Sequence, residues 1–353
     1  TLENIITHVP LDYYVISDTG SDDNTADIIK QFFDEKGIPG EIHHNEWVNF
    51  AHNRNCALQH AQGKTDYVLI FDADDRFEGN FVLPEELTSD RYYLRMANSI
   101  TGANVYFRTL MFRNDDSFYW RGVLHEFVEQ RKKTIVEQKI FGDYYVISGR
   151  FGARSNNPQK YFQDAQVLEK AFYSPEDEDL KDRYAFYTAQ SYRDANMPQK
   201  AIEWYVKRAN LGGWHEEVYY SMLQIALLKI ELNASLDEIQ HLLLAAYEYR
   251  PQRAESLYHL ARQLRLHDKI RLAYIYASAA VNIPLNKDIL FVDHSVYEWK
   301  AKDELAVSAY WVENYQLCYN ICFELLANPV IPDEDKKRFQ SNLDFAKENL
   351  DKD

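Results

Sequence analysis

Cysteine and glycine are scarce in this chain, and each shortage excludes a class of structure. The 353 residues include 3 cysteines and 12 glycines, against 26 tyrosines. Cys56, Cys318 and Cys322 lack zinc-ribbon or redox spacing, so we interpret them as small buried hydrophobes. Few glycines and many tyrosines favour helical hairpins over a turn-rich β-sandwich. Free thiols fit a reducing compartment, and we expect a cytoplasmic protein.

Basic residues and long apolar runs are also in short supply. The formal net charge is −16, which makes nucleic acid a poor default partner because the surface as a whole does not attract phosphate. A local basic patch stays compatible with this charge. The sequence contains no run of about eighteen apolar residues, so we expect no membrane span.

The N-terminal part alternates between apolar runs and helical spacing. Residues 67–71 form a continuous apolar run, as expected for a strand that is buried on both faces. The alternation predicts an α/β domain over residues 1–157, with a mostly parallel sheet covered by helices. The expected strands are residues 13–16, 67–71, 92–96 and 105–112, and the expected helices are residues 23–33 and 53–62.

Amphipathic helices follow one another over residues 158–353. Tyr187, Tyr220 and Tyr258 recur at roughly the period of about 34 residues that is typical of tetratricopeptide (TPR) units. A fourth, weaker hairpin is expected over residues 304–326. We predict an all-α, TPR-like helical-repeat domain, with the number of units left open.

Stacked hairpins form concave surfaces that bind peptides or mediate self-association, so a homodimer through the repeats is one expected assembly. The aromatic residues of this region are interpreted mainly as repeat core. They include Trp204, Trp214, Tyr247 and Tyr249.

Acidic residues cluster directly after two of the expected strands. In open α/β sheets, ligands bind beyond the carboxyl ends of the strands. Asp72 and Asp74 would offer two oxygen ligands to a hard divalent ion, which would neutralise the charge of a departing diphosphate. Asp22 and Asp23 stand before a helical pattern, and helix capping alone would explain them.

Three motifs resemble those of family 2 glycosyltransferases. Residues 15–25, VISDTGSDDNT, resemble the second-strand motif of that family, and residues 50–58, FAHNRNCAL, resemble its Arg-Asn-x-Ala helix start. Residues 69–75, LIFDADD, are similar to its Asp-x-Asp strand end. The resemblance implies a GT-A (Rossmann-like) nucleotide-sugar-binding fold, and a subset of the family carries TPR-like helices after it, as expected here.

The resemblance also implies roles for single residues. Asp18 would accept a hydrogen bond from the nucleotide base, with Thr19 and Gly20 in the same binding turn. Arg54 would face the base or the diphosphate, although a surface helix arginine is the alternative. In the acidic turn, Asp72 would hold the ribose and share the metal, and Asp74 would bind the metal directly. Asp75 would orient its neighbours.

His125 and Glu126 resemble a segment found at this point in the repeat-bearing subset. An inverting transfer needs a base that takes the proton of the acceptor, so Glu126 is the expected base. His125 would be a third metal ligand or an acceptor contact, since neutral imidazole binds metals. A His-Glu pair on the surface at a strand end is the alternative, and Asp115 and Asp116 are weaker candidates for the base.

Arg150 and Arg154 are flanked by glycines in an acidic chain. Glycine permits a mobile loop and arginine matches phosphate oxygens, so the pair predicts a lid over the diphosphate. A linker with solvated arginines explains the pair equally well.

The family pattern begins with a strand that this sequence does not show. Residues 1–6 already have the character of the helix that follows that strand, so one wall of the nucleotide pocket is missing from the expected site. Whether a leader precedes the chain stays open.

The combined expectation is a metal-dependent inverting glycosyltransferase of hexosyltransferase type. The donor would be a nucleotide-diphosphate sugar, with a UDP-sugar favoured, and the ion Mn²⁺ or Mg²⁺. The acceptor is left open between protein, peptide, glycan and modified base. Two rival hypotheses are a non-catalytic TPR scaffold with a degenerate transferase domain and a nucleotidyltransferase, which would release pyrophosphate from a nucleoside triphosphate.

Overall fold

The computed structural model describes residues 1–97, 105–149 and 157–352. The chain divides into two compact units, Thr1–Leu180 and Lys181–Asp353. Each unit is described separately below. The domain boundary expected after residue 157 stays a prediction from the sequence.

The first unit begins with helices and strands in alternation. Helix α1 spans Leu2–His8, strand β1 Tyr14–Asp18, helix α2 Thr25–Lys36, strand β2 Gly40–His44 and helix α3 Phe50–Ala61. Strands β1 and β2 pair in parallel as a separate two-stranded sheet. Helix α3 begins at the Asn49 cap, whose side chain accepts a hydrogen bond from the backbone of His52.

A six-stranded mixed sheet follows. Its strand order is β3-β6-β5-β10-β4, and β9 also pairs with β5. The strands are β3 (Tyr67–Leu69), β4 (Arg76–Gly79), β5 (Arg91–Ala97), β6 (Tyr106–Arg113), β9 (Glu137–Lys139) and β10 (Tyr144–Ile147).

The prediction of a mostly parallel sheet is wrong for this part of the unit. Among the described strands of this sheet, the β5–β10 and β5–β9 pairs are parallel, whereas β3–β6, β5–β6 and β10–β4 are antiparallel. The reason lies in the connections, because a parallel crossover needs about a dozen residues or more. Residues 98–105 are too few for such a crossover, so β5 and β6 run in opposite directions.

The core of the first unit lies along β5 and β10. Residues of β5 alternate between buried and half-buried, which is typical of a strand whose two faces differ in exposure. Tyr92, Leu94 and Met96 of β5 and Val146 of β10 are fully buried. Strands β7 (Phe118–Arg121) and β8 (Phe127–Gln130) form a separate antiparallel hairpin.

The end of the first unit is held by an ion pair. Helix α4 spans Lys160–Phe172, and the short helix η2 spans Glu178–Leu180. The Arg121 guanidinium donates two hydrogen bonds of 2.8 and 2.7 Å to the Asp179 carboxylate. This two-pronged contact ties η2 to the end of β7.

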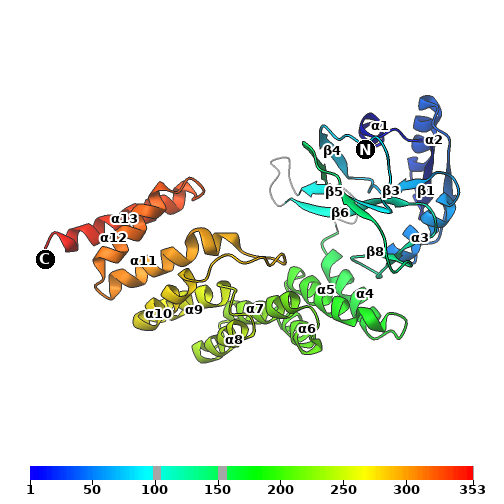
Figure 1. Ribbon diagram of the computed structural model, residues 1–353. Helices are drawn as coiled ribbons and strands as arrows, with labels where there is room; N and C mark the ends of the chain where they lie inside the picture. Colours follow the sequence, from blue (N-terminus) through cyan, green and yellow to red (C-terminus); the bar gives the residue numbers. More distant parts are fainter. Residues whose placement is uncertain (98–104, 150–156, 353) are drawn as a thin grey trace. The chain divides into compact units, whose positions relative to one another are not determined.

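The second unit consists of successive helical hairpins (Figure 1). Tyr187, Tyr220 and Tyr258 lie on α5, α7 and α9, the first helices of three hairpins, and a fourth hairpin follows as expected. The predicted all-helical, TPR-like region is therefore confirmed. Its helices are α5 (Lys181–Asp194), α6 (Pro198–Leu211), α7 (His215–Glu231), α8 (Leu236–Tyr249), α9 (Glu255–Leu266), α10 (Ile270–Val281), α11 (Ala301–Trp311), α12 (Tyr315–Ala327) and α13 (Asp333–Leu350).

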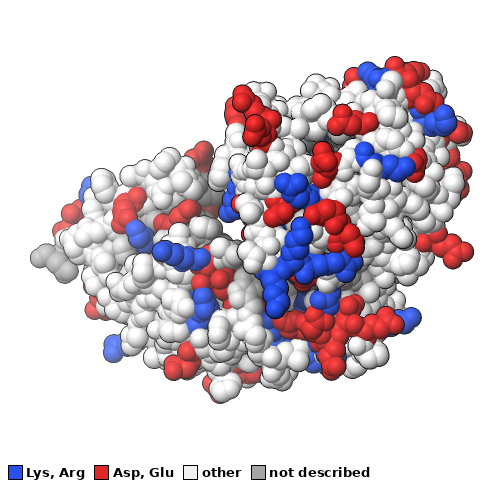
Figure 2. Space-filling view, turned by 45° about the vertical axis from the view of Figure 1, so that its right-hand side comes forward, with Lys and Arg blue, Asp and Glu red and all other residues white. Residues whose placement is uncertain are grey.

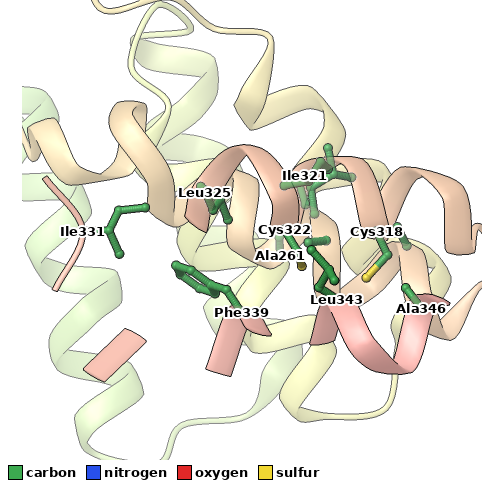
Figure 3. Packing of buried hydrophobic residues seen from close by; sticks show 13 residues of the cluster. Ala261, Cys318, Ile321, Cys322, Leu325, Ile331, Phe339, Leu343 and Ala346 are labelled. Atoms are coloured by element: carbon green, nitrogen blue, oxygen red, sulfur yellow. The ribbon is translucent and has the colours of Figure 1, made fainter. Parts of the chain in front are cut away.

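Two of the three cysteines lie in the core of this second unit. Cys318 and Cys322 are fully buried on α12, where they belong to one cluster with Phe339 and Leu343 of α13 (Figure 3). Both thiols are free, as is that of the half-buried Cys56. The interpretation of the α12 pair as small buried hydrophobes is confirmed. Among the described residues, no helix has the length and apolar character that crossing a membrane requires.

Candidate functional site

Asp18 ends β1 in a network of hydrogen bonds. Its Oδ1 accepts from the Ser21 hydroxyl at 2.6 Å and from the Ser21 backbone at 3.2 Å, while its Oδ2 lies 3.0 Å from His44 Nδ1. The Ser21 hydroxyl and the His44 ring both lower the pKa of Asp18, the Ser21 contact contributing most. Asp18 therefore presents a carboxylate at neutral pH.

A cavity of about 540 Å³ opens beside this carboxylate. Asp18, Thr19 and Gly20 line one side, so the structure brings these three predicted residues together. The other side comes from residues 44–47, which include the last residue of β2 and the three that follow it, and which were not identified from the sequence. The polar sequence of β2 carries no apolar run that would have marked a strand, although the half-exposed Trp47 is an unusual surface residue.

Arg54 joins two distant parts of the candidate site. Its Nη2 donates to Asp72 Oδ1 at 2.5 Å, and its Nε donates to Glu126 Oε1 at 2.8 Å. The guanidinium also lies 4.8 Å from the ring of Trp120. Burial lowers the pKa of Arg54, but the two carboxylates outweigh burial and raise this pKa overall. Arg54, Asp72 and Glu126 thus form one charged cluster with a shared cation.

The neighbouring residue fixes helix α3 against β7. Asn55 Nδ2 donates to the Trp120 carbonyl at 2.9 Å, and Asn55 Oδ1 accepts from the Trp120 backbone at 2.8 Å. The amide side chain therefore pairs with β7 as a strand would. This contact keeps Arg54 within reach of Glu126, which directly precedes β8.

Asp75 is the most deeply buried carboxylate of the acidic turn. It is fully buried, and the hydrogen-bonding side chain beside its carboxylate is that of Ser148. Burial above all, and then the charge of Asp72, raises the pKa of Asp75 to about 6. The chain passes close to this turn at Gly149, where an added Cβ would lie 2.1 Å from the Asp74 carbonyl oxygen.

His125 does not join Asp72 and Asp74 in a metal-binding group. The described part of the chain holds no cluster of three or more His, Cys, Asp or Glu residues with the geometry to bind an ion. His125 lies in the hairpin turn between β7 and β8 with a left-handed φ of 54°, and its side chain is exposed. Such a φ is uncommon for a residue other than glycine and marks local strain.

The other predicted residues lie apart from the Arg54–Asp72–Glu126 cluster or outside the residues that the structure describes. Asp115 pairs with Lys132 at 2.9 Å, and Asp116 lies 3.7 Å from Arg131. Both acids therefore have basic partners of their own. Arg150 and Arg154 fall outside the described residues.

The acidic turn by itself offers too few ligands for a divalent ion. Asp72 is already contacted by Arg54, and Arg108 lies 3.7 Å from its other oxygen. Asp74 has no ion-pair partner among the described residues. Mg²⁺ and similar ions are commonly held by one or two carboxylates together with substrate phosphates and water. Asp72 and Asp74 fit an ion that binds together with a diphosphate.

Comparison with known families identifies the N-terminal part of the chain. The model of the family described as Glycosyl transferase family 2 matches residues 1–88. This part of the chain therefore forms a glycosyl transferase family 2 domain, and a helical region of TPR-like hairpins follows it. No curated protein matches the sequence.

Several solved structures resemble the chain in fold only. BtubC (BKLC) from P. vanneervenii is 13% identical over 56% of this chain and 85% of its own, with a TM-score of 0.43. MamA is 13% identical over 60% of this chain and 98% of its own, with a TM-score of 0.35. A Podosopora anserina protein, described as a kinesin light chain with nearly identical TPR-like repeats, is 12% identical over 56% of this chain and 98% of its own, with a TM-score of 0.31. Structural similarity at TM-scores this low does not indicate a function.

The charge distribution on the surface is mixed. On the face drawn in Figure 2, basic side chains are interspersed among acidic ones. The chain as a whole carries a net charge of −16.

Proposed function

We propose that this protein is a metal-dependent, inverting glycosyltransferase that uses a nucleotide-diphosphate sugar, with a UDP-sugar favoured. The observation that supports this best is a single cavity of about 900 Å³ that is lined by Asp18, Arg54 and Asp72 together. The side chains expected to contact base, diphosphate and ribose thus border one space. The acceptor class stays open between protein, peptide, glycan and modified base.

Asp18 supplies the contact to the base. Its carboxylate is held by Ser21 and His44, and its side chain is 10% exposed. A fixed acceptor of this kind suits the imide N–H of uracil, which is a hydrogen-bond donor. Thr19 and Gly20 bring the backbone close to the same cavity.

Arg54, Asp72 and Asp74 receive the diphosphate end. Asp72 and Asp74 would hold the ion, which supplies neutralisation of the negative charge that develops on the leaving diphosphate. Arg54 and Arg108 flank Asp72 and donate to phosphate oxygens when the donor is present. Asp75, buried behind them, orients the turn through the hydrogen bond from its backbone N–H to the Asp72 carbonyl at 3.0 Å.

Glu126 takes the proton of the acceptor. Its side chain is 9% exposed, and one of its oxygens is held by Arg54. The ion pair fixes the direction of the carboxylate, so the second oxygen is the one that accepts the proton as the acceptor attacks the anomeric carbon. His125, exposed beside it in the hairpin turn, contacts the acceptor.

Donor turnover tests this proposal directly. The purified protein is incubated with a panel of nucleotide sugars and Mn²⁺, and the products are identified by mass spectrometry. We expect release of a nucleoside diphosphate, most rapidly from a UDP-sugar. Release of pyrophosphate from a nucleoside triphosphate would indicate a nucleotidyltransferase. Failure to bind any nucleotide would favour the scaffold hypothesis.

A further inference from the structure

The connection between α10 and the helical segment that leads into α11 is the longest in the second unit. Residues 282–293 lie outside any helix, whereas the next longest connections are residues 250–254 and 328–332. In Figure 1 this connection runs back along the hairpins towards α7 before α11 begins. Connections of about a dozen residues or more without secondary structure are uncommon, and they are usually either functional or disordered. Specific contacts order residues 284–293, which we call the strap.

Charged side chains of the repeats hold the backbone of the strap. Glu216 of α7 accepts hydrogen bonds from the backbone N–H groups of Ile289 and Leu290, both at 2.8 Å. Arg253, in the connection before α9, donates to the carbonyls of Leu290 and Phe291, both at 3.3 Å. Contacts to backbone groups hold a polypeptide whatever its side chains are.

Two side chains of the strap fit defined places on the same repeats. The Asp288 side chain is 7% exposed, because Arg250 donates to both of its oxygens and Arg253 Nη1 donates to its Oδ2 at 3.3 Å. The ring of Phe291, three residues later, lies 4.8 Å from that of Tyr220 on α7. The repeats thus recognise one acidic and one aromatic side chain of the strap.

The binding site for the strap is built on the repeats themselves. The Arg253 side chain has no exposed surface, and the Glu255 carboxylate of α9 accepts from its Nε at 3.0 Å and from its Nη2 at 2.7 Å. The guanidinium also lies 4.7 Å from the ring of Tyr219 on α7. These contacts do not involve the strap, so they keep Arg253 in place when the strap leaves. Its Nη1, which donates to the strap, then calls for another carboxylate.

The strap itself buries little apolar surface. Its residues are all exposed or half-buried, and Ile289 is 81% exposed, Phe291 53% and Leu285 50%. Segments with few buried apolar contacts open at a lower free energy than the helices of a core. We therefore expect the strap to leave its site while α7 and α9 stay folded.

We propose that the strap is an intramolecular ligand, and that its site binds a polypeptide segment of another protein with an acidic side chain followed three residues later by an aromatic one. The acidic side chain takes the place of Asp288 between Arg250 and Arg253, and the aromatic ring takes the place of Phe291 against Tyr220. The docked strap lowers the apparent affinity for this partner, because only molecules with an open site bind it. The proposal rests on contacts within the second unit, and it stands whether or not the protein transfers sugars.

Competition with a synthetic peptide tests this proposal. The probe is a fluorescently labelled peptide with the sequence of residues 284–293, PLNKDILFVD, and its binding is followed by fluorescence anisotropy. The natural chain is compared with a strap variant that carries Asp288→Ala and Phe291→Ala and keeps the repeat helices unchanged. We expect the probe to bind the strap variant about tenfold or more tightly than the natural chain, because the site is open in more molecules. Equal affinity for the two chains would overturn the proposal.

A further substitution in the strap variant identifies the site of the probe. Arg250→Gln should weaken probe binding about tenfold or more, because the probe's aspartate loses a two-pronged, charge-assisted contact. Lys302→Gln is the matched control, since Lys302 pairs with Glu324 of α12 instead, and it should leave the affinity unchanged. Probe binding that is insensitive to Arg250→Gln would overturn the proposal.

Hydrogen exchange in the natural chain keeps the proposal testable if the strap variant does not fold. The amides of Ile289 and Leu290, which donate to Glu216, should exchange about tenfold or more faster than the hydrogen-bonded amides of α7 and α9, because the strap opens locally. If these two amides exchange only together with those of α7 and α9, the strap is a fixed part of the fold and the proposal is overturned.

Discussion

Arg54 is the residue whose replacement tests the candidate site most sharply. The side chain of Arg54 is 20% exposed, that of Asp72 is 30% exposed and that of Glu126 is 9% exposed. The hydrogen bonds from Arg54 to these two carboxylates measure 2.5 and 2.8 Å. Arg54→Met keeps the aliphatic stem over Trp120 but leaves two carboxylates without their shared cation. Breaking a fully buried ion pair lowers the free energy of unfolding by about 3–5 kcal/mol. Solvent around Asp72 weakens the interaction, so we expect Arg54→Met to lower the free energy of unfolding by about 2–3 kcal/mol.

Thermal unfolding of the first unit measures this loss. For a unit of this size, about 1 kcal/mol corresponds to roughly 2–4 °C in Tm, so Arg54→Met should lower Tm by about 5–10 °C. Arg131→Met is the matched control, because Arg131 and Asp116 are 55% and 66% exposed and 3.7 Å apart. Its loss should stay below about 1 kcal/mol.

A double-mutant cycle separates the Glu126 contact from the rest. If Arg54 acts through Glu126, Arg54→Met costs less when Glu126→Gln is already present, with a coupling of about 1–3 kcal/mol. An Arg54→Met loss no larger than that of Arg131→Met, or a cycle without coupling, would refute the shared-cation arrangement.

Three further predictions concern single residues. Glu126→Gln should preserve donor binding in calorimetry and lower transfer about 10²–10⁴-fold, and near-normal transfer would place the base elsewhere. Gly149→Ala should lower Tm and activity together, because its Cβ would lie 2.1 Å from the Asp74 carbonyl oxygen; an unchanged Tm would contradict the close approach. Burial, aided by Arg262, lowers the pKa of His259 to about 4, so its contribution to stability is complete above pH 6.5 and is lost as pH falls towards 4. Urea unfolding of the second unit should therefore lose more stability on acidification in the natural chain than in His259→Gln, and equal losses would contradict this.

Local patterns predicted the parts of the fold that carry apolar runs. Strands β1 and β3 and helices α2 and α3 were found because each contains a continuous or periodic set of apolar residues. The helical hairpins were found for the same reason. Strand β2 was missed because its residues, GEIHH, include a single large apolar side chain.

The arrangement of the candidate site depended on tertiary packing. Arg54 and Glu126 are 72 residues apart, and their contact is set by the pairing of Asn55 with Trp120. The sequence shows three acids in one turn, but only packing decides that Asp75 is buried. The same packing keeps His125 out of a three-residue metal cluster in the described part of the chain.

The central claim is that Asp72 and Asp74 hold a divalent ion together with a nucleoside diphosphate. Calorimetry with UDP, in the presence and absence of Mn²⁺, tests it in the natural chain and in Asp74→Ala. We predict that UDP binds the natural chain only with Mn²⁺ and that Asp74→Ala loses this dependence. The Tm of Asp74→Ala should stay within about 2 °C of that of the natural chain, because a half-buried side chain without an ion-pair partner among the described residues adds little stability. Equal Mn²⁺-dependent affinity of the two proteins for UDP would contradict the claim.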